Sequence, residues 1–176
     1  MIKRMLFVIF MIAIMTSISR AQQKETYVKG RFMSNKELAG IWQRGNDVVG
    51  NGLGQNFQFS QDGQFVLNVG DETEDLQVIL KLKGKYRLDK DQLYFTILTK
   101  MILEGGEIGV GDSLDGNVFS IQDAKRKEVK VNNPKEMQDG CIVRVYTPNH
   151  IRIINVDYYK IDQKKYKIDA DEIERW

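Results

Sequence analysis

The chain is poor in the residues that build disulfide frameworks and histidine or cysteine metal centres. Its 176 residues include one Cys and one His. A single Cys excludes an internal disulfide and a multi-cysteine zinc site. A single His argues against a histidine metal cage and against a Ser-His-Asp apparatus. The hydrophobic fraction of 42% and charged fraction of 28% instead indicate a soluble globular protein, not a disordered or collagen-like one. Repeats, low-complexity linkers and a second domain are also missing from the pattern.

Residues 1–21 have the three parts of a secretory signal peptide. Lys3 and Arg4 precede an apolar run at 5–15, and Ser19 and Ala21 stand three positions and one position before a cut after Ala21. An uncleaved anchor is the competing interpretation, but a span needs roughly 20 apolar residues. Cys is missing near the cut, which disfavours a lipid-modified terminus. We therefore expect an exported protein, periplasmic or secreted, with no membrane span after cleavage. We also expect an N-terminal extension at 22–33 and one domain at 34–176.

Export changes the charge balance of the protein. Removal of residues 1–21 takes away three of 26 basic residues and leaves 23, against 24 acidic residues. This mature charge of −1 gives no electrostatic support for nucleic-acid binding. The basic stretches 125–127 and 164–165 alternate with acidic residues and are predicted to be solvated loop faces.

Apolar residues alternate with polar ones at a period of two from Gly40 onward, which is typical of strands. Turn signals separate these runs at 60–63, 88–91 and 147–150. Only two helical signals are present: a capping box at Ser34–Glu37 and a further turn at 170–176. The pattern predicts an all-β antiparallel barrel or sandwich. Strands are expected at 41–44, 57–59, 65–69, 76–83, 93–97, 141–145 and 151–153, with weaker ones at 118–121, 129–131 and 158–161.

The capped helix runs directly into Leu38-Ala39-Gly40-Ile41-Trp42. This arrangement resembles the lipocalin superfamily, and especially its small secreted bacterial members, in which a short helix precedes G-x-W. The aromatic strand 56–59, the Asp62-Gly63 turn and the strand from Gln64 extend the resemblance. It implies an antiparallel up-and-down barrel of eight strands, with a short N-terminal helix before the first. Trp42 would plug the closed end, Gly40 would let helix and strand approach, and Arg144, Arg152 or Arg175 would pack on the indole.

If this register holds, one apolar face points into the barrel, where eight strands leave room for packed side chains or one small ligand. The residues predicted to face the interior, and to contact a small apolar or amphipathic ligand there, are Phe57, Phe59, Phe65, Leu67, Leu80, Leu82, Phe95, Val143, Val145 and Ile153. Large side chains dominate this set and favour a filled or narrow interior.

Other candidate sites are weaker. The Gly-rich segment 50–54 precedes a strand, not a helix, so a barrel-mouth loop is expected instead of a phosphate site. Asp112, Asp115 and Asn117 could ligate Ca²⁺ but lack the EF-hand spacing, and an ordinary turn is favoured. Glu104 and Glu107 could join these aspartates as a carboxylate pair for glycoside hydrolysis. His150 is expected to be a surface turn residue, and Cys141 a small buried hydrophobe. We expect no metal, no cofactor and no catalytic residue.

Two functions follow as expectations. The first is an exported, non-catalytic, lipocalin-like binder of a small apolar or amphipathic ligand. The second is a packed barrel that docks an envelope protein or glycan through loops at 102–117 and 122–140. An enzyme built on carboxylates between Glu104 and Asp115 ranks third.

Overall fold

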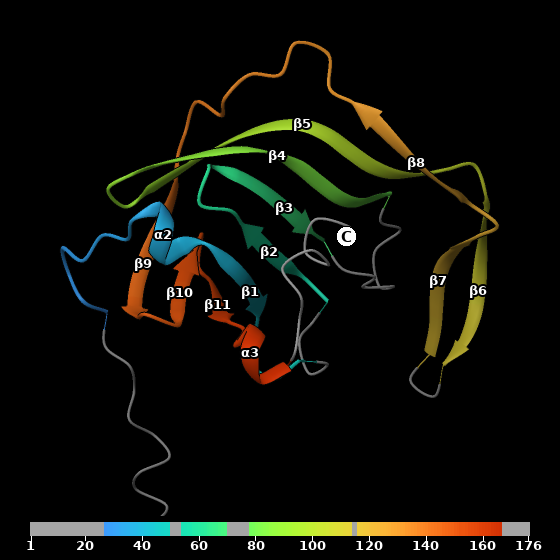
Figure 1. The fold of residues 1–176 in the computed structure, drawn as a ribbon. Helices are drawn as coiled ribbons and strands as arrows, with labels where there is room; N and C mark the ends of the chain where they lie inside the picture. The colour runs from blue at the N-terminus through green and yellow to red at the C-terminus, as the bar shows by residue number, and fades with distance from the viewer. Residues whose placement is uncertain (1–26, 50–53, 70–77, 114–115, 167–176) are drawn as a thin grey trace, which may run out of the picture.

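The computed structural model describes residues 27–49, 54–69, 78–113 and 116–166. The predicted signal peptide, most of the Gly-rich segment 50–54, Asp115 and the predicted tail helix at 170–176 lie outside these ranges. Most of the described chain is strand (Figure 1). The elements are α2 (Asn35–Leu38), β1 (Gly40–Arg44), β2 (Asn56–Phe59), β3 (Gln64–Asn68), β4 (Ile79–Asp89), β5 (Gln92–Glu104), β6 (Glu107–Ser113), β7 (Gly116–Gln122), β8 (Lys125–Lys130), β9 (Cys141–Thr147), β10 (His150–Ile153), β11 (Val156–Lys160) and α3 (Gln163–Tyr166).

Eight of the strands form a closed antiparallel barrel. Each pairs with its neighbour in the order β1-β2-β3-β4-β5-β9-β10-β11, and β11 returns to β1 through the pair Trp42–Lys160. The predicted up-and-down barrel with a short helix before its first strand is confirmed. Because the barrel closes, each of these eight strands has a hydrogen-bonded neighbour on both sides. The seam between β5 and β9 is the short one, with two paired positions, Gln92–Ile142 and Leu93–Cys141.

Helix α2 covers one end of the barrel through Trp42. The Ser34 capping box is present as predicted. The Trp42 side chain is fully buried, and its Nε1–H donates to the carbonyl of Leu38 at 2.6 Å. Gly40 has φ +129°, and a Cβ there would lie 2.9 Å from Cε of Lys160. The close neighbour of this glycine is therefore the Lys160 side chain on β11, and the approach of helix and strand that the G-x-W pattern predicts stays a prediction.

The cation above Trp42 among the described residues is Lys160, whereas Arg144 or Arg152 was predicted there. The Lys160 ammonium lies 5.3 Å from the indole centroid and donates to the Glu37 carbonyl at 2.6 Å. Burial lowers the pKa of Lys160. Arg144 and Arg152 alternate with buried residues and face outward, and Arg175 lies outside the described residues. Lys160 takes this place because its register position is directly opposite Trp42.

The barrel interior contains a cluster of aromatic rings. Phe95 lies at its centre, with ring centroids 4.6 Å from Phe65 and 5.7 Å from Phe57, and the Phe57 ring stacks on Phe59 at 5.2 Å. Of the ten residues predicted to face inward, seven are buried, Leu67 and Leu82 pack against them, and Leu80 is half-buried outside the cluster. The rings therefore contact one another inside the barrel.

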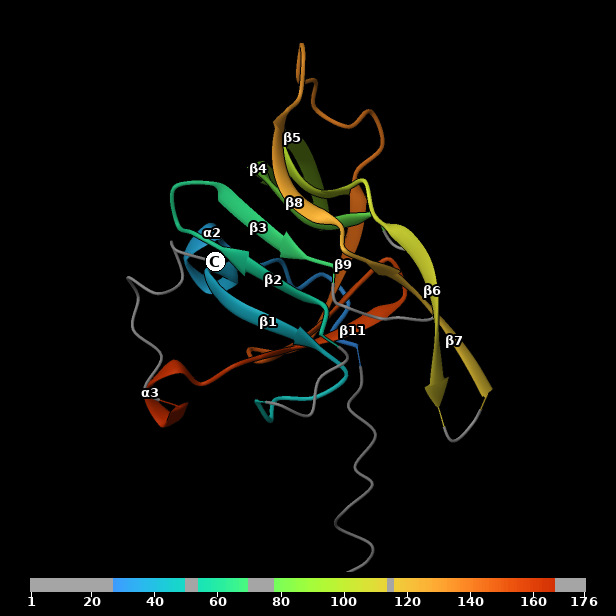
Figure 2. The same cartoon turned by 90° about the vertical axis from the view of Figure 1, so that its right-hand side faces the viewer.

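The segment predicted as a long loop at 102–117 is mostly strand, and the one at 122–140 includes β8. β5 continues to Glu104, β6 and β7 form a hairpin, and β8 pairs with β5 from Thr99 to Glu104. Irregular chain follows β8 up to Gly140. Figures 1 and 2 show β6, β7 and β8 together on one side, away from the helix-covered end. The described residues contain no helix that is long and apolar enough to cross a membrane.

Candidate functional site

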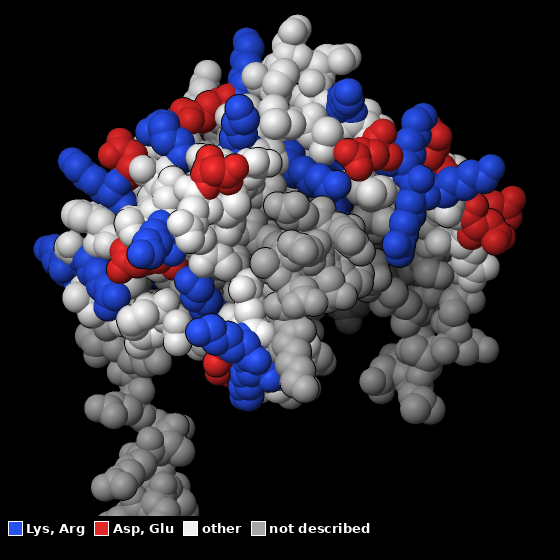
Figure 3. Space-filling model, viewed as in Figure 1, with Lys and Arg blue, Asp and Glu red and all other residues white. Residues whose placement is uncertain are grey.

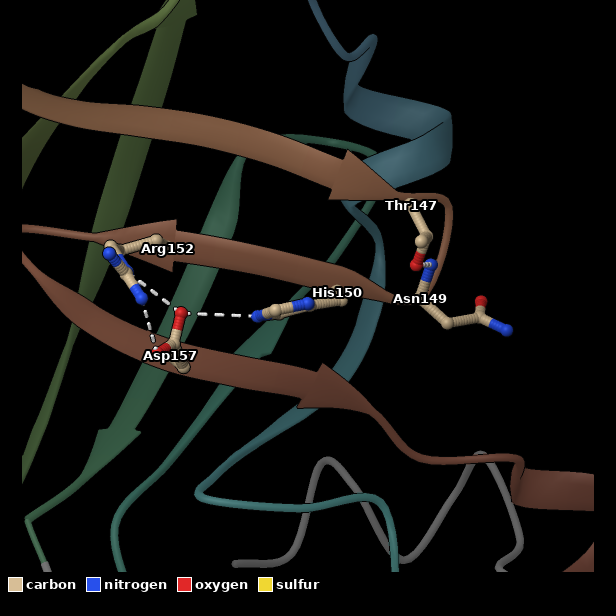
Figure 4. Close-up of polar contacts among 5 residues, drawn as sticks. All are labelled: Thr147, Asn149, His150, Arg152 and Asp157. Carbon is tan, nitrogen blue, oxygen red and sulfur yellow. Dashed lines mark hydrogen bonds and ion pairs between the residues drawn. The ribbon is translucent and has the colours of Figure 1, made fainter. Parts of the chain in front are cut away.

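The outer face of the last three strands carries a polar cluster (Figure 4). Its side chains alternate along β9, β10 and β11 with buried Val143, Val145, Ile151, Ile153 and Tyr158. Strand alternation therefore turns the polar residues away from the core. The cluster consists of Arg144, Tyr146, His150, Arg152, Asp157 and Tyr159.

A bidentate ion pair lies at the centre of the cluster. Arg152 and Asp157 are directly opposite on β10 and β11, with Nε–Oδ1 at 2.8 Å and Nη2–Oδ2 at 2.7 Å. His150 Nε2 lies 3.1 Å from the same Oδ1. The hydrogen bond from Arg152, and secondarily that from His150, lowers the pKa of Asp157 against the opposing effect of burial. Arg152 is thereby held in one orientation.

His150 is buried, and its prediction as a surface turn residue was wrong. Its ring is sandwiched between Tyr146 at 4.7 Å and Tyr159 at 4.3 Å, both nearly parallel to it. The turn itself consists of Pro148 and Asn149, because His150 already pairs with Thr147. The Thr147 hydroxyl accepts the Asn149 N–H at 3.2 Å and stabilises this turn. His150 is therefore the first residue of β10.

A pocket of about 400 Å³ lies beside Arg152. It lies where the β10–β11 turn approaches the chain that leads into β9. Its lining residues are Met137, Asp139, Gly140, Cys141, Ile142, Arg144, Arg152, Ile154 and Asn155. This volume is within the range of small-molecule sites, which combine apolar walls with a few placed polar groups.

Two arginines face this pocket from adjacent strands. Arg144 pairs directly with Arg152 in the β9–β10 register. Like charges placed directly opposite one another are destabilising. Asp157 neutralises the Arg152 side chain. The Arg144 side chain is exposed and forms no hydrogen bond or ion pair with the described residues. Asp139 supplies the acidic side chain of the lining and makes no ion pair with Arg144.

The apolar part of the lining is exposed to solvent. Exposed fractions are 42% for Met137, 47% for Ile142 and 62% for Ile154. Ile154 and Asn155 form the β10–β11 turn with φ +46° and +66°. A β-branched residue rarely adopts positive φ, and this conformation costs about 1–2 kcal/mol. The chain thus presents an apolar side chain at a strained position on the pocket rim.

The other predicted sites do not form a ligand set in the described ranges. Asp112 and Asn117 are paired in the β6–β7 hairpin, and Asp115 lies outside the described residues. Glu104 ends β5 and pairs with Lys127. Within the described ranges, no three His, Cys, Asp or Glu side chains gather as metal ligands would. Cys141 is buried, and burial raises the pKa of its thiol. The ligand role of the ten interior residues stays a prediction.

The pocket was missed by sequence reasoning, which treated Arg144 and Arg152 only as partners for Trp42. One signal in the sequence could have indicated it. Ile154-Asn155 lies between two strand patterns, at a two-residue turn where Asn-Gly is the usual pair, so the isoleucine there is unusual. Comparisons with family models, curated proteins and solved structures found no match to this chain. The assignment of a function therefore rests on the geometry of the chain itself.

Proposed function

We propose that this protein is an exported, lipocalin-like barrel that binds a small amphipathic carboxylate without transforming it, and that the ligand occupies the pocket at Arg144. The main support is that Arg144 and Arg152 lie directly opposite one another on β9 and β10, and that Arg152 has a carboxylate partner, Asp157. The basic and apolar start of the sequence supports export. The G-x-W motif, together with the closed barrel of eight strands, supports the likeness to lipocalins.

A ligand carboxylate fits the charge pattern of the pocket. Arginine presents a planar fork of N–H donors that matches a carboxylate, and such charge-assisted hydrogen bonds are the strong ones. Asp157 already occupies the fork of Arg152. Arg144 is therefore the residue that would receive the ligand, and a bound anion would also relieve its repulsion with Arg152.

A short hydrocarbon tail fits the remaining lining. Met137, Ile142 and Ile154 offer exposed apolar surface around the pocket. Each buried methylene contributes about 0.8 kcal/mol. A ligand with a carboxylate and a medium-length chain would satisfy both parts of the site at once. Octanoate combines these two features and is the probe that we choose.

The proposal predicts that binding needs both ends of the probe. Calorimetric titration of the mature protein with octanoate is expected to show one site. Acetate lacks the hydrocarbon chain and octanol lacks the carboxylate, so each is expected to bind at least about 10-fold more weakly. Arg144→Gln is expected to weaken octanoate about 10-fold while leaving octanol unchanged. Asp139→Asn is expected to tighten octanoate, since it removes a repulsive charge.

Lys164→Gln is the matched control, because it removes one exposed positive charge on α3, outside the pocket lining. It is expected to bind octanoate as the parent does. Equal loss in Lys164→Gln and Arg144→Gln would mean that net charge, not the pocket, attracts the anion. Unchanged binding in Arg144→Gln would place octanoate elsewhere and contradict the proposal.

The packed interaction module remains the second candidate function. Its specific support is the stacking of Phe57, Phe59 and Phe95 on one another inside the barrel. The strands β6, β7 and β8, which lie to one side of the barrel, would then carry the docking surface (Figure 1).

A further inference from the structure

The barrel sheet continues past its closure as a three-stranded extension. β5 pairs with β9 only at Gln92 and Leu93, and its far half pairs instead with β8. On its other side, β5 stays paired with β4 along the whole length of β4. The extension is therefore formed by the first half of β4, the second half of β5 and β8.

Five cationic side chains share one face of this extension. Lys83 and Lys130 are both paired with Thr99, and Lys81 and Glu128 are both paired with Met101, so these residues lie on the same side. Lys85 follows Lys83 by two residues, and Arg126 precedes Glu128 by two. We call this surface the basic face, and its cations are Lys81, Lys83, Lys85, Arg126 and Lys130.

Acidic side chains offset little of this charge. Glu128 is the acid on the basic face, 3.5 Å from Lys83. The pKa of Lys81 is lowered, first by burial and then by repulsion from Lys83 and Arg126, against the attraction of Glu128. Figure 3 shows basic side chains, with acidic ones beside them, where β8 and the adjoining ends of β4 and β5 lie. An anionic partner would relieve this repulsion.

The composition of the basic face indicates which class of anion it binds. No aromatic residue occurs in β8 or between Thr96 and Glu104 of β5, so the face offers no ring on which bases would stack. Met101 and Leu103 are half-buried on this face, and Val78, whose carbonyl accepts the Leu103 N–H, is exposed. An interfacial membrane site needs a group of exposed apolar side chains, not one. Threonine hydroxyls alternate with the cations, and lysines two residues apart along β4 repeat at about 7 Å.

We propose that the basic face binds an acidic polysaccharide, with uronate carboxylates on the lysines and sugar hydroxyls on Thr96 and Thr99. The contacts extend along β4 and β8, and the paired strands hold the cations in place before binding. This site is separate from the pocket at Arg144, so the two proposals succeed or fail independently.

Polygalacturonate is the test polymer, immobilised and exposed to the mature protein at low and physiological salt. Binding is expected to weaken steeply with salt, because the contacts are exposed charges. Lys83→Gln/Lys130→Gln is expected to bind about 10-fold or more weakly, and Lys83→Arg/Lys130→Arg to bind as the parent does, because charge is kept. Lys36→Gln/Lys164→Gln, which removes two exposed charges from the helices, is the matched control and should bind within about 2-fold of the parent.

Three results would overturn the proposal. Equal weakening in the helix control would show attraction by net charge alone. Tighter binding to a thymidine 20-mer or to phosphatidylglycerol vesicles would assign the face to nucleic acid or to a membrane surface. Comparable binding to neutral dextran would show that the cations do not recognise the polymer. Octanoate binding by the Lys83→Gln/Lys130→Gln variant, measured in parallel, reports on folding and on the pocket separately.

Discussion

Ile154 occupies a backbone conformation that its side chain disfavours. At φ +46° the Cβ is crowded, and asparagine tolerates this region far better. We predict that Ile154→Asn raises the free energy of unfolding by about 1 kcal/mol and weakens octanoate binding, because it removes apolar lining. Urea unfolding and calorimetry on the same variant check both parts. A variant that is less stable than the parent would show that Ile154 is not strained, and one that binds octanoate equally well would show that Ile154 does not contribute to binding.

Asp157 gives the outer cluster a predictable dependence on pH. Its pKa lies below the ordinary aspartate value of 3.8, chiefly because Arg152 donates to it. A depressed folded-state pKa contributes stability that is present above the unfolded value and is lost as pH falls through the folded one. Asp157→Asn is therefore expected to lower the free energy of unfolding by about 1 kcal/mol at pH 6, allowing for solvent screening of this partly exposed pair.

The difference between parent and Asp157→Asn should shrink when unfolding is measured at pH 3 or below. A gap of the same size at pH 6 and at pH 3 would show that the carboxylate charge does not contribute. At the scale of residues, the burial of Trp42 and Cys141 could be predicted from the sequence, because each depends on local spacing. The burial of His150 could not, because it arises from tyrosines on two neighbouring strands that only the register brings together.

At the scale of elements, Gly84 marks a close approach between β4 and β5. The pairing shifts between Lys83 and Gly84, and a Cβ on Gly84 would meet the backbone carbonyl of Thr96. Gly84→Ala is expected to lower the free energy of unfolding by about 2–4 kcal/mol, since backbone must move. Gly105→Ala is the matched control: its Cβ meets no atom within 4 Å, and its φ of +72° limits the cost to about 1 kcal/mol. Equal costs in chemical denaturation would contradict a close contact at Gly84.

Strands with alternating apolar residues could be predicted from the sequence, whereas β8 was predicted only at its end, within the weaker strand at 129–131. Its sequence, Lys-Arg-Lys-Glu-Val-Lys, is exposed throughout, and its charges are typical of a loop. It is a strand because the far half of β5 offers an unpaired edge, which is a long-range effect. The α3 helix was likewise absent from the local signals. The cations of β8 could therefore be assigned to the same face as Lys81 and Lys83 only from the strand register.

At the scale of the whole molecule, alternation and turn signals predict an antiparallel barrel or sandwich and leave the choice open. The resemblance carried by the short helix and the G-x-W motif narrows this to a closed barrel of eight strands, which the structure has. The location of the proposed binding site could not be predicted from these signals. Alternation marks inward residues, and a ligand site was expected among them, whereas their rings contact one another. The outer pocket is formed by residues from two separate segments, 137–144 and 152–155, and its charge depends on which arginine Asp157 neutralises.

A small amphipathic carboxylate is proposed to bind outside the barrel, beside Arg144. Titration of the ¹⁵N-labelled mature protein with octanoate, followed by amide chemical shifts, tests this most directly. We predict that the shift changes concentrate at 137–144 and 152–155, while the amides of Phe57, Phe59 and Phe95 in the interior change little. Shifts concentrated at those phenylalanines would place the ligand inside the barrel, and the absence of saturable shifts would show that octanoate does not bind; either result would contradict the claim.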